Sequence, residues 1–221
     1  MLRLLSSSIG KKLVMAVTGV ALLGFLVAHM AGNLTLYLGQ DSLNGYAATL
    51  KGNPLLWPAR LGLLTVFGLH VATGISLARE NRNARPIRYD RVEPQTATWA
   101  SRYIVFTGLV VLFFVVFHLL HFTIGAVQSE VFHGVDAQGR HDVYGMVTGA
   151  FSNPIVSGVY VLAMAVLGFH LYHAVQSAVQ TLGFAHKSYK QTLEFGAKAI
   201  VALIVIGNCS FPVFVLAGLV G

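Results

Sequence analysis

Residues 102–127 read RYIVFTGLVVLFFVVFHLLHFTIGAV, and this stretch decides the fold. After Arg102 it contains no Asp, Glu, Lys or Arg, and two histidines stand among its apolar side chains. An α-helix needs about 20 mainly apolar residues to cross the hydrocarbon core of a bilayer. Lipid offers the backbone no hydrogen-bond partner, so such a segment crosses as a helix. We therefore predict a membrane-spanning helix over Arg102–Val127.

Four further segments have the same character: Leu13–Leu38, Leu55–Ala78, Ile155–Leu182 and Leu193–Val220. The first of them is too long for a signal peptide. The chain is 55% hydrophobic and 10% charged, whereas a soluble domain is about 25% charged. We predict an all-α integral membrane protein with a single domain over residues 1–221. Four of its five transmembrane helices form a bundle, the fifth is peripheral, and Pro212 is expected to kink that fifth helix.

The positive charges predict the orientation, because cytoplasmic loops of membrane proteins are rich in Lys and Arg. Twelve of the 15 Lys and Arg residues lie on one side of the predicted spans, and three lie on the other. The twelve are Arg3, Lys11, Lys12, Arg79, Arg82, Arg85, Arg88, Arg91, Arg102, Lys187, Lys190 and Lys198; the three are Lys51, Arg60 and Arg140. We expect a cytoplasmic N-terminus and an outside C-terminus.

We expect none of the connections between the spans to form a separate domain. Asp41–Leu50 is predicted to be a short interfacial helix that Asn53-Pro54 ends. Gln128–Asn153 is expected to cover the outer face, and the loop Arg79–Ser101 is expected to be extended, serving either topology alone or the docking of a soluble partner. The net charge is +7, but the sequence lacks the pattern of basic and aromatic residues that is typical of a nucleic-acid-binding fold. We therefore expect no nucleic acid as a partner.

Six of the nine histidines lie within the predicted spans: His29, His70, His118, His121, His170 and His173. Ionisable side chains at membrane depth are costly and mark functional sites. At about 1.5 Å per residue, His29 and His118 both lie roughly 24 Å from the cytoplasmic end, whereas His70 and His170 lie about 12 and 18 Å from it. This arrangement predicts two haems in the four-helix bundle, each held by two imidazoles.

Two predicted spans contain two histidines each, His118 with His121 and His170 with His173, and a faint internal repeat helps to choose between them. Thr18-Gly19 and Thr107-Gly108 precede His29 and His118 by the same number of residues, which favours His118 over His121 as the ligand. Small residues also follow His70 and His170 by one turn, at Gly74 and Ala174, where they leave room for a haem edge. His121 and His173 are expected either to bond a propionate or a ligand, or to form ordinary interhelical hydrogen bonds.

Other chemistries fit the sequence less well. The single cysteine, Cys209, excludes a disulfide framework and any Cys-ligated iron–sulfur cluster within this chain. All eight Asp and Glu residues lie in loops or at span ends, which disfavours a zinc or di-iron site. The same distribution disfavours a proton or ion transporter. A structural anchor without haem would not need four histidines at paired depths.

The sequence resembles the single-chain dihaem cytochrome b subunits of the succinate dehydrogenase and fumarate reductase family. Three regions carry this resemblance: SSIGKKLVMAVTG at 7–19 with AHMAGNL at 28–34, FHL at 117–119, and FHLYH at 169–173 with QTLG at 180–183. The resemblance implies that His29 and His118 bind the distal haem iron and that His70 and His170 bind the proximal one. It also implies a bacterial cytoplasmic membrane, a flavoprotein and an iron–sulfur partner, and a quinone substrate, most simply menaquinone.

In such a complex this chain carries electron transfer and quinone reduction, and the flavoprotein oxidises succinate. The basic residues Lys11, Lys12 and Arg102 are then expected either to reach haem propionates or to contact lipid headgroups. Some dihaem fumarate reductases have an acidic residue two positions before the fourth-helix ligand, where this chain has Gly168. That difference favours succinate oxidation over the alternative, a quinol:fumarate reductase. A cytochrome b of another respiratory dehydrogenase is a more remote alternative. The residues available to a quinone lie on both sides of the membrane: Asn44, Tyr46, Glu130 and Asp142 outside, and Ser7 inside.

Overall fold

The computed structural model describes residues 7–84, 102–184, 186, 188 and 190–221. In this part of the chain the regular elements are helices, apart from an isolated bridge between Val135 and His141. Five helical segments are long and apolar enough to cross a membrane: Ser8–Leu38, Leu56–Asn83, Ile104–Ile124, Pro154–Thr181 and Gln191–Leu216. The predicted all-α fold with five spans is confirmed. Five residues of the predicted basic surface lie outside the described residues: Arg3, Arg85, Arg88, Arg91 and Lys187. Most of the loop expected to be extended, from residue 85 to residue 101, also lies outside them.

The helix ends follow from local chemistry. The first span consists of α2 (Ser8–Asn33) and the 3-10 helix η1 (Leu34–Leu38). It begins five residues before the predicted Leu13, because the Ser7 hydroxyl caps it by accepting a hydrogen bond from the Gly10 amide at 3.1 Å. The third span consists of α6 (Ile104–Leu119) and a π-helical turn, η2 (Leu120–Ile124). Gly125 stops it in the left-handed region at φ 74°, three residues before the predicted end.

The remaining spans are α4 (Leu56–Asn83), α9 (Pro154–Thr181) and α10 (Lys190–Leu216). α9 begins at a proline, and the Asn153 side chain caps it. α4 runs five residues past the predicted Ala78, so its charged last turns continue the helix beyond the apolar stretch. α10 continues as a helix through Pro212.

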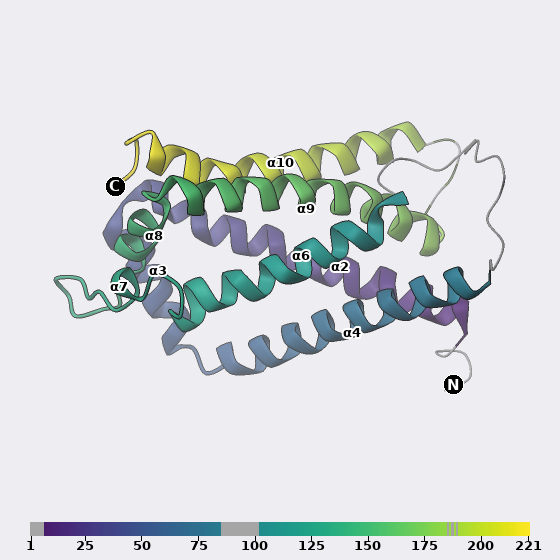
Figure 1. Cartoon of the computed structure of the whole chain (residues 1–221), viewed down its shortest axis with the longest axis horizontal. Coiled ribbons are helices and arrows are strands. Elements are labelled where there is room, and N and C mark those ends of the chain that lie inside the picture. The colour runs from purple at the N-terminus through teal and green to yellow at the C-terminus, as the bar shows by residue number, and fades with distance from the viewer. Residues whose placement is uncertain (1–6, 85–101, 185, 187, 189) are drawn as a thin grey trace.

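Helices α2, α4, α6 and α9 form the bundle, and α10 packs along the outside of α9 (Figure 1). An apolar core formed by Ala163, Leu167, Val201 and Ile204, with side chains of α2 packed against it, joins α9 and α10. α4 packs along α2 but contributes no buried residue of its own. The start of α2 and the end of α10 lie at opposite ends of the bundle (Figure 1). We call the end with the start of α2 the N-side, and the end with the end of α10 the C-side.

Three short helices cover the C-side: α3 (Gln40–Gly52), α7 (Ser129–Phe132) and α8 (Val143–Phe151). α3 extends the predicted Asp41–Leu50 by a residue or two at each end, and it ends at Asn53 as expected. A polar cluster joins α3 to the segment before α8, and we call it the clasp: Asn44, Asp136, Arg140 and Asp142. Asn44 at its centre is fully buried. The clasp keeps the long connection between α6 and α9 folded over the bundle.

Candidate functional site

Four of the predicted histidines come together as two pairs inside the bundle. His29 of α2 faces His118 of α6 with ring centres 5.9 Å apart and planes at 83°. His70 of α4 faces His170 of α9 with ring centres 6.5 Å apart and planes at 71°. We call these the C-side pair and the N-side pair, after the end to which each lies nearer. The structure thus places together the same residues that the depth estimate pairs.

The two pairs lie at separate levels of the membrane. In α2, the Thr18 hydroxyl contacts His70 of the N-side pair, and His29 follows 11 residues later. In α6, Thr107 contacts His170, and His118 also follows 11 residues later. At about 1.5 Å per residue, each helix places the levels about 16 Å apart. The faint sequence repeat therefore corresponds to a repeated geometry.

Aromatic rings surround the C-side pair. Phe25 stacks on His29 with ring centres 5.4 Å apart, and Phe122 lies edge-on to His118 at 5.7 Å. The Tyr160 hydroxyl of α9 lies 3.4 Å from Nδ1 of His118. Asn33, one turn after His29, places its amide nitrogen 3.3 Å from His29 Nε2. These neighbours make the C-side level apolar, with few polar partners for the imidazoles.

Two threonines hold the N-side pair. Thr18 Oγ1 lies 3.0 Å from Nδ1 of His70, and Thr107 Oγ1 lies 3.3 Å from Nδ1 of His170. Each threonine lies one residue before a glycine that packs against the same ring. A Cβ built on Gly19 would lie 3.5 Å from His70 Cε1, and a Cβ on Gly108 would lie 3.2 Å from His170 Cε1. A larger residue at position 108 would therefore press on the imidazole.

The donor set fits two bis-imidazole haems. Two imidazoles that bind one metal ion from opposite sides place their ring centres about 6 Å apart, because each metal–nitrogen bond is about 2 Å long. Both pairs have this separation. Among the described residues, no three His, Cys, Asp or Glu side chains converge as a metal site. Each pair supplies two imidazole donors, which suits a metal ion whose other four positions are filled by a macrocycle.

The other predicted site residues have different surroundings. His121 is 2% exposed and both its ring nitrogens have partners: Nδ1 lies 3.0 Å from the Tyr160 hydroxyl, and Nε2 lies 2.9 Å from Gln128 Oε1. It therefore forms interhelical bonds, and Tyr160 joins it to His118. His173 lies one turn from His170 on α9 and is half-buried. Gly74 faces the Met15 side chain of α2, with a built Cβ 3.6 Å from Met15 Cε.

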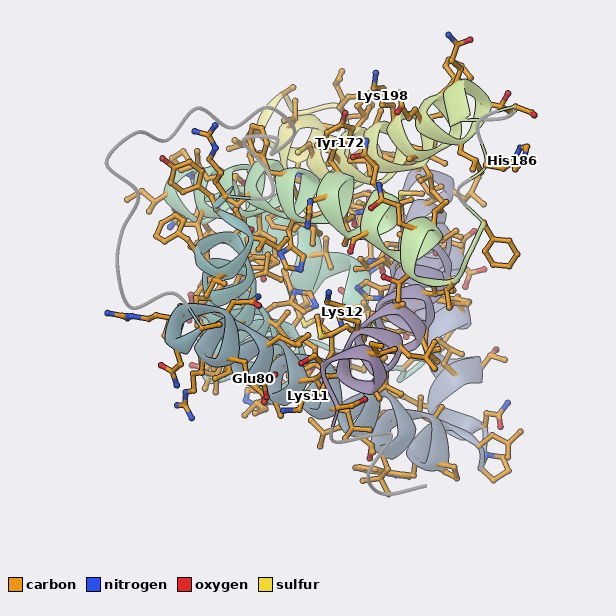
Figure 2. All side chains as sticks on the ribbon, turned by 90° about the vertical axis from the view of Figure 1, so that its right-hand side faces the viewer. Lys11, Lys12, Glu80, Tyr172, His186 and Lys198 are labelled. Atoms are coloured by element: carbon orange, nitrogen blue, oxygen red, sulfur yellow. The ribbon has the colours of Figure 1, made fainter. Side chains whose placement is uncertain are left out.

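The basic candidates lie on the N-side. Figure 2 views this end and shows Lys12 among the bundle helices, whereas Lys11 lies beside Glu80 of α4. Lys11 forms an ion pair with Glu80 and donates to the Ser76 hydroxyl at 2.9 Å. Arg102 is exposed just before α6. Lys12 and Arg102 are thus available at the N-side to an anionic group, and the Lys11 ammonium joins α2 to α4.

Sequence reasoning missed Tyr160, Gln128 and the contacts of both threonines. A tyrosine within an apolar span was a signal for Tyr160, since a buried hydroxyl usually has a partner. Comparison of the chain with family models, with curated proteins and with solved structures finds no match in any of the three. The functional assignment therefore depends on the residues of this chain.

Proposed function

We propose that this protein is the dihaem cytochrome b subunit that anchors a succinate:quinone oxidoreductase in a bacterial cytoplasmic membrane. The observation that carries the proposal is the set of two imidazole pairs, at separations of 5.9 and 6.5 Å, inside a membrane-spanning four-helix bundle. A transporter or a purely structural anchor has no use for two such pairs.

The chain's own residues do the positioning. His29 with His118, and His70 with His170, would hold two haem b groups at levels about 16 Å apart across the bilayer. Each haem, when bound, supplies a one-electron iron couple. Phe25, Phe114 and Phe122 pack around the C-side imidazoles and keep water from that level. Lys12 and Arg102 would meet propionates at the N-side.

The partners follow from charge and from the resemblance. The N-side is the basic side, so it faces the cytoplasm, and the C-terminus lies outside. A flavoprotein that oxidises succinate and an iron–sulfur protein would dock there, and electrons would cross this chain to a membrane quinone, most simply menaquinone. The clustered cysteines that an iron–sulfur centre needs are supplied by the partner, since this chain has one cysteine.

The packing at Gly168 supports succinate oxidation as the direction. A Cβ built on Gly168 would lie 2.9 Å from Val205 Cγ2 of α10, so this position is filled by the neighbouring helix. The acidic residue found there in some fumarate reductases would have to displace the Val205 side chain of α10. A transmembrane proton path through position 168 is therefore not part of the proposal.

The test is a reduced-minus-oxidised spectrum of the purified full complex, together with a haem count per chain. We expect b-type absorption, two haems, and co-purification of a flavoprotein and an iron–sulfur protein with succinate:quinone activity. Absence of b-type absorption would refute the dihaem cytochrome, whereas two haems with partners of another kind would refute only the succinate assignment.

The ligand assignment has a matched test on α9. His170→Ala removes one donor of the N-side pair and should leave one haem, whereas His173→Ala, one turn away, should leave two. Haem content and the spectra of both variants distinguish these outcomes. Retention of both haems in His170→Ala would exclude His170 as a ligand.

A further inference from the structure

The hydroxyls of Thr18 and Thr107 have their own protons engaged elsewhere. Thr18 Oγ1 lies 2.6 Å from the Val14 carbonyl, and Thr107 Oγ1 lies 3.0 Å from the Ile104 carbonyl. A carbonyl oxygen only accepts, and a hydroxyl has one proton to donate. Each threonine therefore donates to its own helix and has only lone pairs left for the neighbouring imidazole.

This engagement favours the same tautomer for both N-side imidazoles. Where the threonine oxygens accept, Nδ1 of His70 and Nδ1 of His170 each donate an N–H. His170 also has a hydrogen bond to the backbone of Ile104. In a neutral imidazole the other nitrogen then has a free lone pair. Nε2 of both rings is thus the atom available to a metal. The adjacent glycines let the rings approach closely enough for these bonds, with bare Cα atoms facing Cε1.

We propose that Thr18 and Thr107 are positioning residues that hold His70 and His170 as Nε2 donors and set the redox potential of the N-side haem. The inference rests on the proposed function and deepens it. An acceptor on Nδ1–H raises the basicity of the opposite nitrogen. A more basic ligand favours the more highly charged ferric iron, so both threonines lower the midpoint potential of the N-side haem.

The C-side pair differs. Its imidazoles meet a tyrosine hydroxyl at 3.4 Å and an asparagine amide at 3.3 Å. An amide nitrogen donates, so Asn33 does not strengthen His29 as the threonines strengthen their partners. The Tyr160 hydroxyl, which also lies 3.0 Å from His121 Nδ1, can accept from His118 in the same way, although at a longer distance. Thr18 and Thr107 themselves bond to the N-side imidazoles, so the N-side haem should respond to threonine substitution while the C-side haem does not.

The experiment uses Thr18→Val and Thr107→Val in the complete complex, because valine has nearly the shape of threonine and lacks the hydroxyl. Thr18→Ser and Thr107→Ser retain the hydroxyl. Thr65→Val is the control: its hydroxyl also donates to its own helix, at 2.8 Å to the Leu61 carbonyl, but its side chain is exposed. Optical redox titration gives both midpoint potentials, and His70→Ala identifies which belongs to the N-side haem.

We expect Thr18→Val to raise the N-side potential and Thr107→Val to raise it less, because His170 keeps its bond to the Ile104 backbone. Both variants should leave the C-side potential unchanged. Loss of a comparable partner weakens metal binding about 10- to 100-fold; a tenfold effect on the ferric state alone equals about 59 mV for one electron. The double variant should shift further, and the Ser variants should resemble wild type. Loss of the N-side haem alone in the Val variants, with both haems retained in the Ser variants, would also support the role of the threonine hydroxyls.

Three results would overturn the inference: a shift no larger than that of Thr65→Val, an equal shift of both haems, or Ser variants that behave like Val variants. Each presupposes a wild-type complex with two haems. A wild-type complex without haem is the separate result that refutes the proposed function, so the two failures are distinguishable.

Discussion

Removing the Asn44 side chain should release the C-side connection while leaving the bundle intact. Asn44 Nδ2 donates to Asp136 at 3.0 Å and to Asp142 at 2.9 Å, and its Oδ1 accepts from the Tyr144 amide at 2.9 Å. The side chain is fully buried between α3 and the start of α8. Asn44→Ala deletes all three bonds at once.

The size of the effect follows from what each partner retains. Asp136 still has Arg140, and Asp142 still caps α8 through the Gly145 amide, so both carboxylates remain bonded. The Tyr144 amide loses its side-chain acceptor in the first turn of α8. The unsatisfied Tyr144 amide costs about 1–3 kcal/mol, and the two lost bonds to carboxylates that keep other partners add about 1 kcal/mol together. The opening free energy of the connection should therefore fall by about 2–4 kcal/mol.

Hydrogen exchange followed by mass spectrometry measures this opening directly. Amides of α8 should exchange roughly 30 to 700 times faster, since 1.4 kcal/mol is a factor of ten, while those of α9 should be unchanged. Gln40→Ala is the control, because Gln40 also donates to Asp142, at 3.0 Å, but is exposed. An acceleration below about threefold, or an equal one for Gln40→Ala, would contradict the reasoning.

Three further outcomes follow. Burial would raise the pKa of Asp136, but bonds from Arg140, Asn44 and the Gln138 amide lower it from 3.8 to about 2. The clasp should therefore be fully stable above pH 3.8 and weaken as pH falls toward 2, measured by hydrogen exchange corrected for intrinsic rates. Asp136→Asn should reduce that dependence to the part contributed by Asp142, whose pKa is also lowered. Tyr160→Phe leaves His121 Nδ1 buried without its partner, which should cost about 1–3 kcal/mol in thermal or denaturant unfolding; unchanged stability would show that the bond is not needed. Gly168→Ala should push against Val205 and lower the free energy of unfolding by about 1–3 kcal/mol. Its control is Gly158→Ala on the same helix, whose Cβ would meet nothing within 4 Å and which should be neutral or stabilising. Equal effects of the two variants would contradict the packing at Gly168.

The spans and the histidine pairs could be predicted because both depend on quantities that a sequence contains. Apolar run length gives the helices, and the fixed rise per residue gives the depth of His29 and His118. The helix ends could be predicted less well. Lys11 and Glu80 lie beyond the predicted spans, yet both lie in helices and pair with each other across α2 and α4. The clasp could not be predicted, since Asn44 and Asp142 are 98 residues apart and only the fold brings them together.

The Thr-Gly repeat shows how a correct signal can have an unexpected structural meaning. The matching offsets before His29 and His118 indicate which residues of α2 and α6 are equivalent, but a sequence does not say what those threonines touch. In the structure they touch the histidines of the other pair, on α4 and α9. α2 and α6 therefore each supply one histidine of the C-side pair and one threonine that contacts a histidine of the N-side pair, on α4 and α9 respectively. Each pair takes one imidazole from the half formed by α2 and α4 and one from the half formed by α6 and α9, so neither half forms a pair alone. α10 contributes to neither pair and lies outside the bundle.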